Sequence, residues 1–247
     1  MNEKLRVLDL FSGIGGFSLG LERTGGFETV AFCEADQFCQ RVLIKNWPMV
    51  EIWNDVRSLT SDQLEREIDV ICGGFPCQPF STASAGRRLG QADDRYLWPH
   101  MLRLISEIRP RWVIGENVTG IEGMALEQVV SDLESLGYEV APPLEIPACA
   151  VGHDHWRPRF WFLAHANGGG EPIGTIHAKA SKLPKCNRHA SRMGAEDGFS
   201  RGLDRHRLRA LGNAVVPQIP EIIGRAILAA EGRIDMSPIE TPEGTDK

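Results

Sequence analysis

Cys77 has the sequence setting that points most directly to chemistry. It follows an apolar run at residues 69–73 and two glycines, and Pro76 and Pro79 bracket it in the segment FPCQP. Each proline fixes its own φ and favours extended geometry in the residue before it. A thiol held in this way at the end of a strand is a candidate nucleophile. The alternative is a buried cysteine that packs as a small apolar side chain.

A glycine-rich turn follows the first apolar run, at residues 9–16 (DLFSGIGG). Glycines permit a tight turn and let the next helix approach a ligand with its N-terminus. Glu34, at the end of the second predicted strand, is well placed to bind both hydroxyls of a ribose. Asp55, after a third strand, could accept a hydrogen bond from an adenine amine. Together these residues predict an adenosine-containing cofactor, although either acid alone could be a solvated loop residue.

Strand and helix patterns alternate along residues 5–165. The predicted strands are 5–11, 28–34, 69–73 and 111–116, and the predicted helices are 16–23, 36–46, 61–67, 96–107 and 127–136. Such alternation predicts an α/β fold with parallel strands and crossover helices. Residues 138–146 and 159–164 are predicted as an antiparallel pair of strands at the sheet edge, and 217–230 as a final helix.

Composition places the chain among proteins of a reducing compartment. Its 247 residues can form one α/β domain with a small appendage, and its six cysteines show no regular framework. We therefore expect free thiols and a cytoplasmic location. The first residues lack the apolar core of a signal peptide, and no apolar run is long enough to cross a membrane.

Charge is unevenly distributed along the chain. The net charge is −6, yet residues 166–210 contain nine Lys or Arg and only four Asp or Glu. A basic segment on an acidic body is expected where one face meets a polyanion. A solvated loop whose charges only maintain solubility is the alternative.

The organisation predicted from these patterns has four parts. Residues 1–166 form the catalytic and cofactor-binding domain, and 167–205 form a short, loop-rich insert with little periodicity. Residues 206–231 return to the catalytic domain, and 232–247 form a polar tail that we expect to be disordered.

Five motifs in this order resemble those of the DNA (cytosine-5) methyltransferases. They are the glycine-rich turn at 9–16, GFPCQ at 74–78, GENV at 115–118, RPR at 157–159 and RALGNAVVP at 209–217. The resemblance covers about residues 5–230. It implies a Rossmann-like S-adenosylmethionine-dependent methyltransferase fold with a mostly parallel sheet, and a target-recognition insert at 167–205.

The resemblance implies a specific catalytic set. Cys77 would add as a thiolate to C6 of cytosine, and Glu116 would share a proton with N3, for which it needs a raised pKa. Arg159 would hold O2 of the base, and Arg157 would support the site or a phosphate. The target base would be flipped out of the duplex.

The same resemblance implies the residues of the other binding sites. The expected S-adenosylmethionine site comprises Phe11, Gly13, Gly15, Gly16, Glu34, Ala35, Asp55, Val56, Pro76, Asn213 and Val215. A mobile catalytic loop at 81–96 would bring Ser81, Arg87, Arg88 and Arg95 to DNA. In the insert, Lys179, Lys182, Lys185, Arg188 and Arg192 would contact phosphates. The small insert predicts a short recognition sequence.

One motif departs from the family pattern. His155 stands where the family has Gln, so the support of the two arginines is open to question. His153 and His155 lack further ligands at metal-binding spacing, and His177, Cys186 and His189 lack a fourth zinc ligand, so we expect no metal.

The expected partner is double-stranded DNA, with no membrane, and the expected state is a monomer. Whether a cognate restriction endonuclease accompanies the protein is left open. Two alternatives remain. One is a methyltransferase acting on transfer RNA, although the Cys-Phe-Thr segment of that branch is absent. The other is an inactive DNA-binding relative, although Cys77 and Glu116 are both present.

Overall fold

The computed structural model describes residues 3–76, 96–119, 124–166 and 210–234. An eight-stranded sheet has the order β3-β2-β1-β4-β5-β8-β6, with β7 also paired to β8. The strands β1 (Leu5–Leu10), β2 (Phe27–Cys33), β3 (Glu51–Trp53), β4 (Val70–Gly73) and β5 (Trp112–Val118) are parallel neighbours. The predicted α/β class with a mostly parallel sheet is therefore confirmed.

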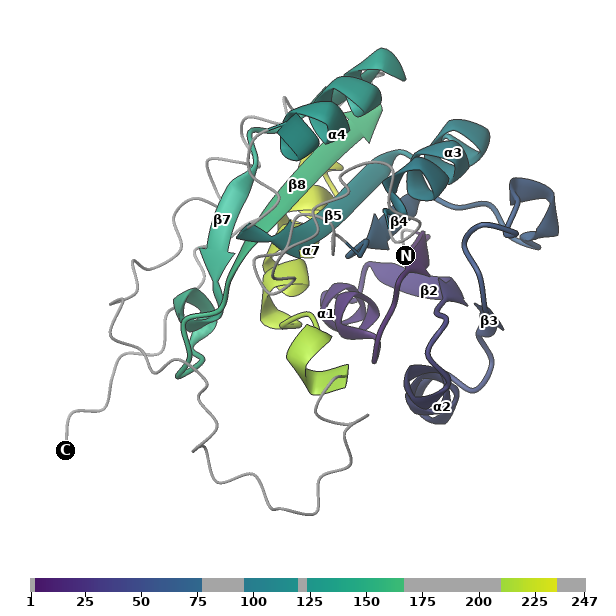
Figure 1. The fold of residues 1–247 in the computed structure, drawn as a ribbon, viewed down its shortest axis with the longest axis horizontal. Coiled ribbons are helices and arrows are strands. Elements are labelled where there is room, and N and C mark those ends of the chain that lie inside the picture. Colours follow the sequence, from purple (N-terminus) through teal and green to yellow (C-terminus); the bar gives the residue numbers. More distant parts are fainter. Residues whose placement is uncertain (1–2, 77–95, 120–123, 167–209, 235–247) are drawn as a thin grey trace, which may run out of the picture.

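Helices cover both faces of this sheet (Figure 1). On one face, α3 (Trp98–Ile108) and α4 (Met124–Ser135) pack against Leu8, Ile71 and Val113. On the other, α1 (Gly16–Arg23) and α7 (Gln218–Ala230) pack against the alternate residues of the same strands, such as Val7 and Ile114. Side chains alternate across a strand, so residues buried on both faces give the continuous apolar runs seen in the sequence.

The crossover α2 (Gln37–Asn46) begins with a side-chain cap. Asp36 accepts hydrogen bonds from the backbone N–H groups of Phe38 and Cys39 at 2.8 and 3.2 Å. Such a cap satisfies donors that the first helical turn leaves unpaired. None of the helices in the described residues is long and apolar enough to cross a membrane.

Two predicted elements are wrong. The predicted helix 61–67 is a single 3₁₀ turn, η1 (Ser61–Gln63). The chain then runs extended, because Arg66 pairs with Glu28 and Asp69 pairs with Arg6 across neighbouring strands. The predicted strand 138–146 is two strands, β6 (Tyr138–Val140) and β7 (Leu144–Pro147), because two prolines at 142–143 interrupt it.

The strand β8 (Pro158–Ala166) lies beside the edge strands β6 and β7, which confirms the predicted antiparallel pair at the sheet edge. It runs antiparallel to β5 on one side and to β6 and β7 on the other. Among the cysteines of the described residues, Cys33 and Cys72 are buried free thiols and Cys39 is also buried, whereas Cys149, in η5 (Ala148–Val151), is disulfide-bonded. The expectation of free thiols is therefore wrong at Cys149.

Asp9 is a buried acid between β1 and the helix that follows it. Its Oδ2 accepts hydrogen bonds from the Ser18 hydroxyl at 2.7 Å and the Ser18 N–H at 3.3 Å. Burial raises the pKa of Asp9 to about 7, and the Ser18 hydrogen bonds only partly oppose this. The protein therefore favours the protonated form of Asp9 more than the unfolded chain does.

This burial predicts a pH-dependent stability. Because the pKa of Asp9 is raised in the folded state, its favourable contribution is present below about pH 4 and is lost as the pH rises to about 7. Across this pH range the contribution of Asp9 to the free energy of unfolding should fall by roughly 4 kcal/mol. Asp9→Asn keeps an oxygen acceptor for Ser18. In this variant, the free energy of unfolding measured in urea should differ less between pH 5 and pH 8 than in the wild type. The exposed Asp62→Asn is the control, and an unchanged slope in Asp9→Asn would contradict the assignment.

Candidate active site

The carboxyl ends of the parallel strands form one edge of the sheet. The turn after β1 lies there, with Glu34 after β2, Asp55 after β3, Gly74 after β4 and Glu116 near the end of β5. At this edge, β1 connects to β2 on one side while β4 lies on its other side. Such a switch in strand order is where open α/β sheets bind ligands.

Glu116 and Arg159 form an ion pair at this edge. The antiparallel register places Arg159 opposite Val118, two residues from Glu116 and on the same face of the sheet. The Arg159 Nε lies 3.0 Å from the Glu116 Oε1, and the two side chains are only 23% and 13% exposed. An Arg–carboxylate pair with this burial is held much more firmly than a surface pair.

Burial and charge act on Glu116 in opposite directions. Burial raises the pKa of its carboxyl, and the neighbouring Arg159 and Arg157 lower it in part, so that the net direction is upward. Burial also lowers the pKa of Arg157, and the positive charge of Arg159 adds to that lowering. A carboxyl with a raised pKa can retain a proton closer to neutral pH, which a general acid requires.

Close packing near Glu116 leaves room only for glycine at positions 74 and 115. A Cβ built on Gly74 would lie 2.9 Å from the Glu116 Oε2, and one built on Gly115 would lie 1.8 Å from the Phe162 ring. Phe162 in turn packs with Phe75 and Trp98. Gly74 of the GFPCQ motif therefore leaves room for the Glu116 carboxylate, and Gly115 of the GENV motif leaves room for the Phe162 ring.

Asn117 fixes the segment that leads to the candidate nucleophile. It is buried, and its side-chain amide donates to the Phe75 carbonyl at 3.0 Å. Phe75 is itself buried, with its ring 5.2 Å from that of Trp98. The chain is thus held two residues before Cys77, which lies outside the described residues. The sequence prediction omitted Asn117, although its position beside Glu116 in GENV was a signal for it.

The candidate cofactor site is built around Glu34. Its carboxylate accepts a hydrogen bond from the Gly13 N–H and another from the Asp36 N–H, both at 2.7 Å. Phe11, Gly13 and Gly15 have φ values of 54°, 56° and 85°, so the turn follows a left-handed path that is unusual for phenylalanine. The space where a Gly13 Cβ would stand has no heavy atom within 4 Å. The space beside Gly13, next to this carboxylate, is therefore open.

The segment before α7 packs against the start of α1. A Cβ on Gly16 would lie 2.5 Å from the Val215 carbonyl oxygen, and one on Gly20 would lie 2.2 Å from that of Pro217. Val215 is half-buried here, whereas Asn213 is exposed. The late motif and the glycine-rich turn, about 200 residues apart in sequence, are thus neighbours.

The remaining predicted cofactor residues lie at the same edge. The Asp55 carboxylate accepts hydrogen bonds from the N–H and Nε of Arg57 at 3.0 and 3.1 Å, and the backbone hydrogen bond lowers its pKa. Its side chain is 46% exposed, which leaves acceptor sites open. Val56 is buried, Pro76 is half-buried and Ala35 is exposed.

His155 does not pair with the arginines of its motif. Its Nδ1 lies 3.5 Å from the Asp154 Oδ1, its ring stands 5.4 Å from that of His153, and the Nε2 atoms of both rings are buried without a hydrogen-bond partner. Arg157 has a φ of 27° and donates to the Leu211 carbonyl at 3.4 Å. Within the described residues, no group of three or more His, Cys, Asp or Glu could hold a metal ion.

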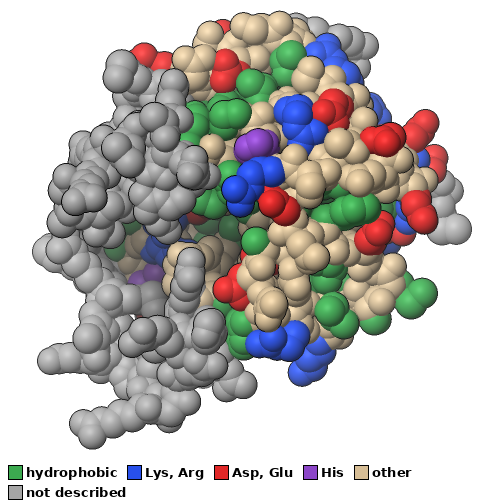
Figure 2. All heavy atoms as spheres, turned by 45° about the vertical axis from the view of Figure 1, so that its right-hand side comes forward, with side chains coloured by type: hydrophobic (Ala, Val, Ile, Leu, Met, Phe, Trp, Pro, Cys, Tyr) green, Lys and Arg blue, Asp and Glu red, His purple; other side chains and the backbone are tan. Residues whose placement is uncertain are grey.

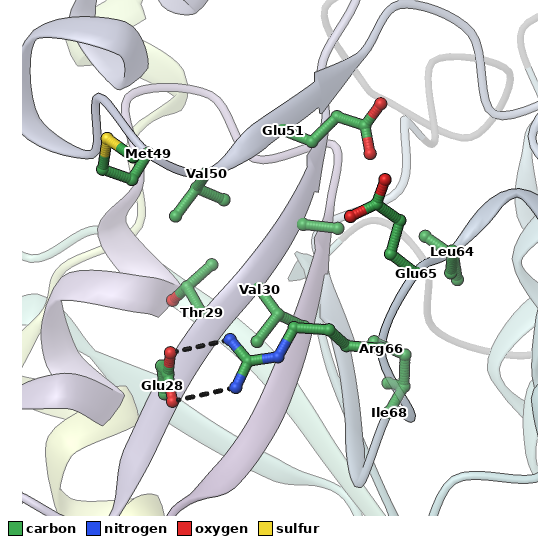
Figure 3. A pocket seen from close by; sticks show the side chains of 11 residues that line it. Glu28, Thr29, Val30, Met49, Val50, Glu51, Leu64, Glu65, Arg66 and Ile68 are labelled. Carbon is green, nitrogen blue, oxygen red and sulfur yellow. Dashed lines mark hydrogen bonds and ion pairs between the residues drawn. The ribbon is translucent and has the colours of Figure 1, made fainter.

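A separate concavity lies at the opposite end of the strands (Figure 3). It has a volume of about 250 Å³ and is lined by residues of β2, β3 and the segment before β4, including Glu28 and Arg66. None of its lining residues belongs to the predicted site, so it is distinct from the edge that carries Glu116.

Comparison with known proteins decides the family. Residues 5–197 match the family described as C-5 cytosine-specific DNA methylase. The chain belongs to this family. The predicted resemblance is therefore confirmed.

The similar curated proteins are bacterial type II methyltransferases. The chain is 38% identical to M.HgiBI of Herpetosiphon aurantiacus over 143 residues, which are 56% of this chain and 32% of that protein. It is 37% identical to M.Eco47II of Escherichia coli over 174 residues, 67% of this chain and 40% of that protein. The matched region thus spans about a third of the length of M.HgiBI.

Solved structures of methyltransferases share the fold. A DNA modification methyltransferase encoded within an E. coli prophage has 31% identity and a TM-score of 0.57, over 66% of this chain and 47% of that one. The Entamoeba histolytica methyltransferase EhMeth has a TM-score of 0.65 over 92% of this chain and 99% of that one, at 14% identity, which shows the fold alone.

Several predicted site residues of this family member lie outside the described residues. Besides Cys77, these are Ser81, Arg87, Arg88 and Arg95 of the expected catalytic loop, and Lys179, Lys182, Lys185, Arg188 and Arg192 of the insert. The residues at 177, 186 and 189, which we do not expect to bind zinc, also lie outside the described residues.

The electrostatics of Glu116 lead to a direct prediction. Replacing Arg159 by Met removes the positive charge that pairs directly with Glu116 and should raise the pKa of Glu116 further. Arg157→Met should raise it less. The measurement is the carboxyl ¹³C shift of labelled glutamate against pH, with Arg225→Met on α7 as a distant control. Equal shifts in all three variants would contradict the described site.

Proposed function

We propose that this chain transfers a methyl group from S-adenosylmethionine to C5 of cytosine in double-stranded DNA. The observation that carries the proposal is the buried Glu116 carboxyl, whose pKa is raised and which pairs with Arg159 one strand away from the segment leading to Cys77. This is the combination of acid and positive charge that activates a cytosine ring. Membership of the C-5 cytosine-specific DNA methylase family supports it.

The described residues fit S-adenosylmethionine. Each oxygen of the Glu34 carboxylate has one backbone donor and keeps acceptor capacity for a ribose hydroxyl. The half-exposed Asp55 can accept from the adenine amine, and the open space at Gly13 adjoins both the turn and Glu34. When bound, S-adenosylmethionine supplies the methyl group as an electrophile.

The chain's own residues activate the base. The Cys77 thiolate adds through Sγ to C6 of cytosine while the Glu116 carboxyl gives its proton to N3, so C5 becomes nucleophilic. C5 would then gain the methyl group as S-adenosylhomocysteine leaves, and the proton on C5 would pass to solvent water. The C6–Sγ bond then breaks, and the proton on N3 returns to Glu116. The thiolate and the acid are restored, and the product is 5-methylcytosine.

The two arginines support different parts of this step. Arg159, held by the Glu116 carboxylate, would bind O2 of the base and stabilise charge that develops on the ring. Arg157 has a strained backbone and reaches the Leu211 carbonyl, so it would link the base site to the late motif that carries Asn213. Its role would be to position the site or to contact a phosphate.

DNA contact is assigned to segments outside the described residues. On the face drawn in Figure 2, the basic side chains of the described residues are interspersed with acidic ones and do not gather into one patch. We assign most phosphate contacts to the basic residues of the 81–96 loop and the 167–205 insert. The enzyme would act as a cytoplasmic monomer on a flipped-out base, alone or beside a restriction endonuclease.

The covalent step is tested by removing the nucleophile and the acid separately. Cys77→Ser should abolish methyl transfer to duplex DNA, and Glu116→Gln should lower kcat by roughly 10²- to 10⁴-fold because no proton reaches N3. The measurement is labelled-methyl transfer, with trapping on 5-fluorocytosine DNA as a second readout. Asp62→Asn, an exposed acid, serves as the control.

The outcomes separate the alternatives. Turnover on duplex DNA without a trapped adduct would refute the role of Cys77. Methylation of transfer RNA in place of DNA would favour the RNA reaction, and methylation of neither, with DNA binding retained, would favour an inactive relative.

A salt series tests the phosphate contacts. If the insert lysines and arginines neutralise phosphates, binding to a DNA duplex should weaken steeply between about 50 and 200 mM salt because counterions are released. Replacing Lys179, Lys182 and Lys185 together should reduce the slope of log Kd against log salt by about three. A wild-type affinity that does not change with salt would refute these contacts.

A further inference from the structure

The adenine-binding segment is weakly held by the sheet itself. Asp55 and Val56 follow β3, a three-residue edge strand that pairs, among the described strands, with β2 alone. After β3 the chain forms a turn, in which the N–H groups of Ser58 and Leu59 both reach the Asp55 carbonyl at 3.2 Å. A short edge strand and a single turn give little restraint to a ligand-binding carboxylate.

Arg103 on α3 supplies the missing restraint. Its Nη2 donates to two main-chain carbonyls of this turn, those of Val56 at 2.9 Å and Leu59 at 2.7 Å. The side chains of Val56 and Leu59 are buried in the same core cluster as α3. Hydrogen bonds from a charged donor are stronger than neutral ones, and losing them would leave these carbonyls without their guanidinium partner.

Glu107 completes the contact one helical turn later. Its Oε1 accepts from the Arg103 Nη1 at 2.7 Å, and its Oε2 accepts from the Ser61 N–H at 3.1 Å. The pair therefore orients the guanidinium and holds the segment at a third main-chain point. Neither side chain is among the residues assigned to the cofactor or to the base.

We infer that Arg103, oriented by Glu107, is a positioning residue of the cofactor site. It holds the turn in which Asp55 and Val56 would meet the adenine of S-adenosylmethionine, and the inference rests on the proposed function. Arg103 contacts the main chain of that turn and not the reacting groups. Its loss should therefore weaken cofactor binding and leave the chemical step unchanged.

Calorimetric binding of S-adenosylhomocysteine to the full chain tests this role. Arg103→Met should weaken binding by about tenfold, since charge-assisted hydrogen bonds that fix the turn are lost. The affinity of Arg103→Lys for S-adenosylhomocysteine should lie between those of Arg103→Met and the wild type. The matched control is Arg66→Met, which removes an exposed ion pair with Glu28 in the same β3–β4 connection and should bind as wild type.

Kinetics separate positioning from general destabilisation. Arg103→Met should raise the KM for S-adenosylmethionine while kcat at saturating cofactor stays within about twofold of wild type. Unchanged affinity in Arg103→Met, or a fall in kcat with unchanged KM, would overturn the inference. If Arg103→Met does not fold, Glu107→Gln replaces it, with an expected weakening of roughly threefold, and wild-type affinity there would overturn the inference.

A different result would refute the proposed function itself. If wild type and Arg66→Met also bind no S-adenosylhomocysteine, the cofactor assignment itself is wrong. Wild-type binding together with equal binding by the Arg103 variants refutes only the positioning role.

Discussion

The antiparallel pairing of β8 with β5 is the constraint on which the site depends. Because β8 runs against β5, it begins at the edge where the parallel strands end, so Arg159 meets Glu116 there. A parallel strand in this position would place its first residues at the opposite edge. Gly115 permits the close approach by leaving room for the Phe162 ring. The site is therefore a product of strand direction as much as of residue type.

Two largely buried carboxyls in this fold, those of Asp9 and Glu116, have different surroundings. Asp9 sits beneath the glycine-rich turn, where Ser18 hydrogen bonds tie it to the start of α1. Glu116 lies at the edge, where Arg159 and Arg157 partly offset the cost of its burial. Burial raises the pKa of both, yet only Glu116 has positive charges beside it that a substrate could share. The distinction between a structural acid and a candidate catalytic acid lies in these neighbours.

Local patterns predicted most of the fold and failed where long-range contacts competed. The helices predicted over 16–23 and 36–46 are formed as α1 and α2, because apolar spacing is a local signal. The helix expected at 61–67 was not formed, since Arg66 and Asp69 have partners on β2 and β1. The antiparallel pair at the sheet edge was predicted, whereas the division of 138–146 into β6 and β7 was missed.

The sequence by itself determined the family and the parallel sheet, and it proposed Glu116, Arg159, Glu34 and Asp55 as site residues, since motif order and residue chemistry are carried along the chain. Only the tertiary structure decided how these groups are held: Asn117 on the Phe75 carbonyl, Val215 against Gly16, and Arg103 on the turn after β3. Each of these contacts joins segments at least 40 residues apart, and their partners are backbone atoms. Backbone atoms are the same in every residue, so a sequence cannot mark them.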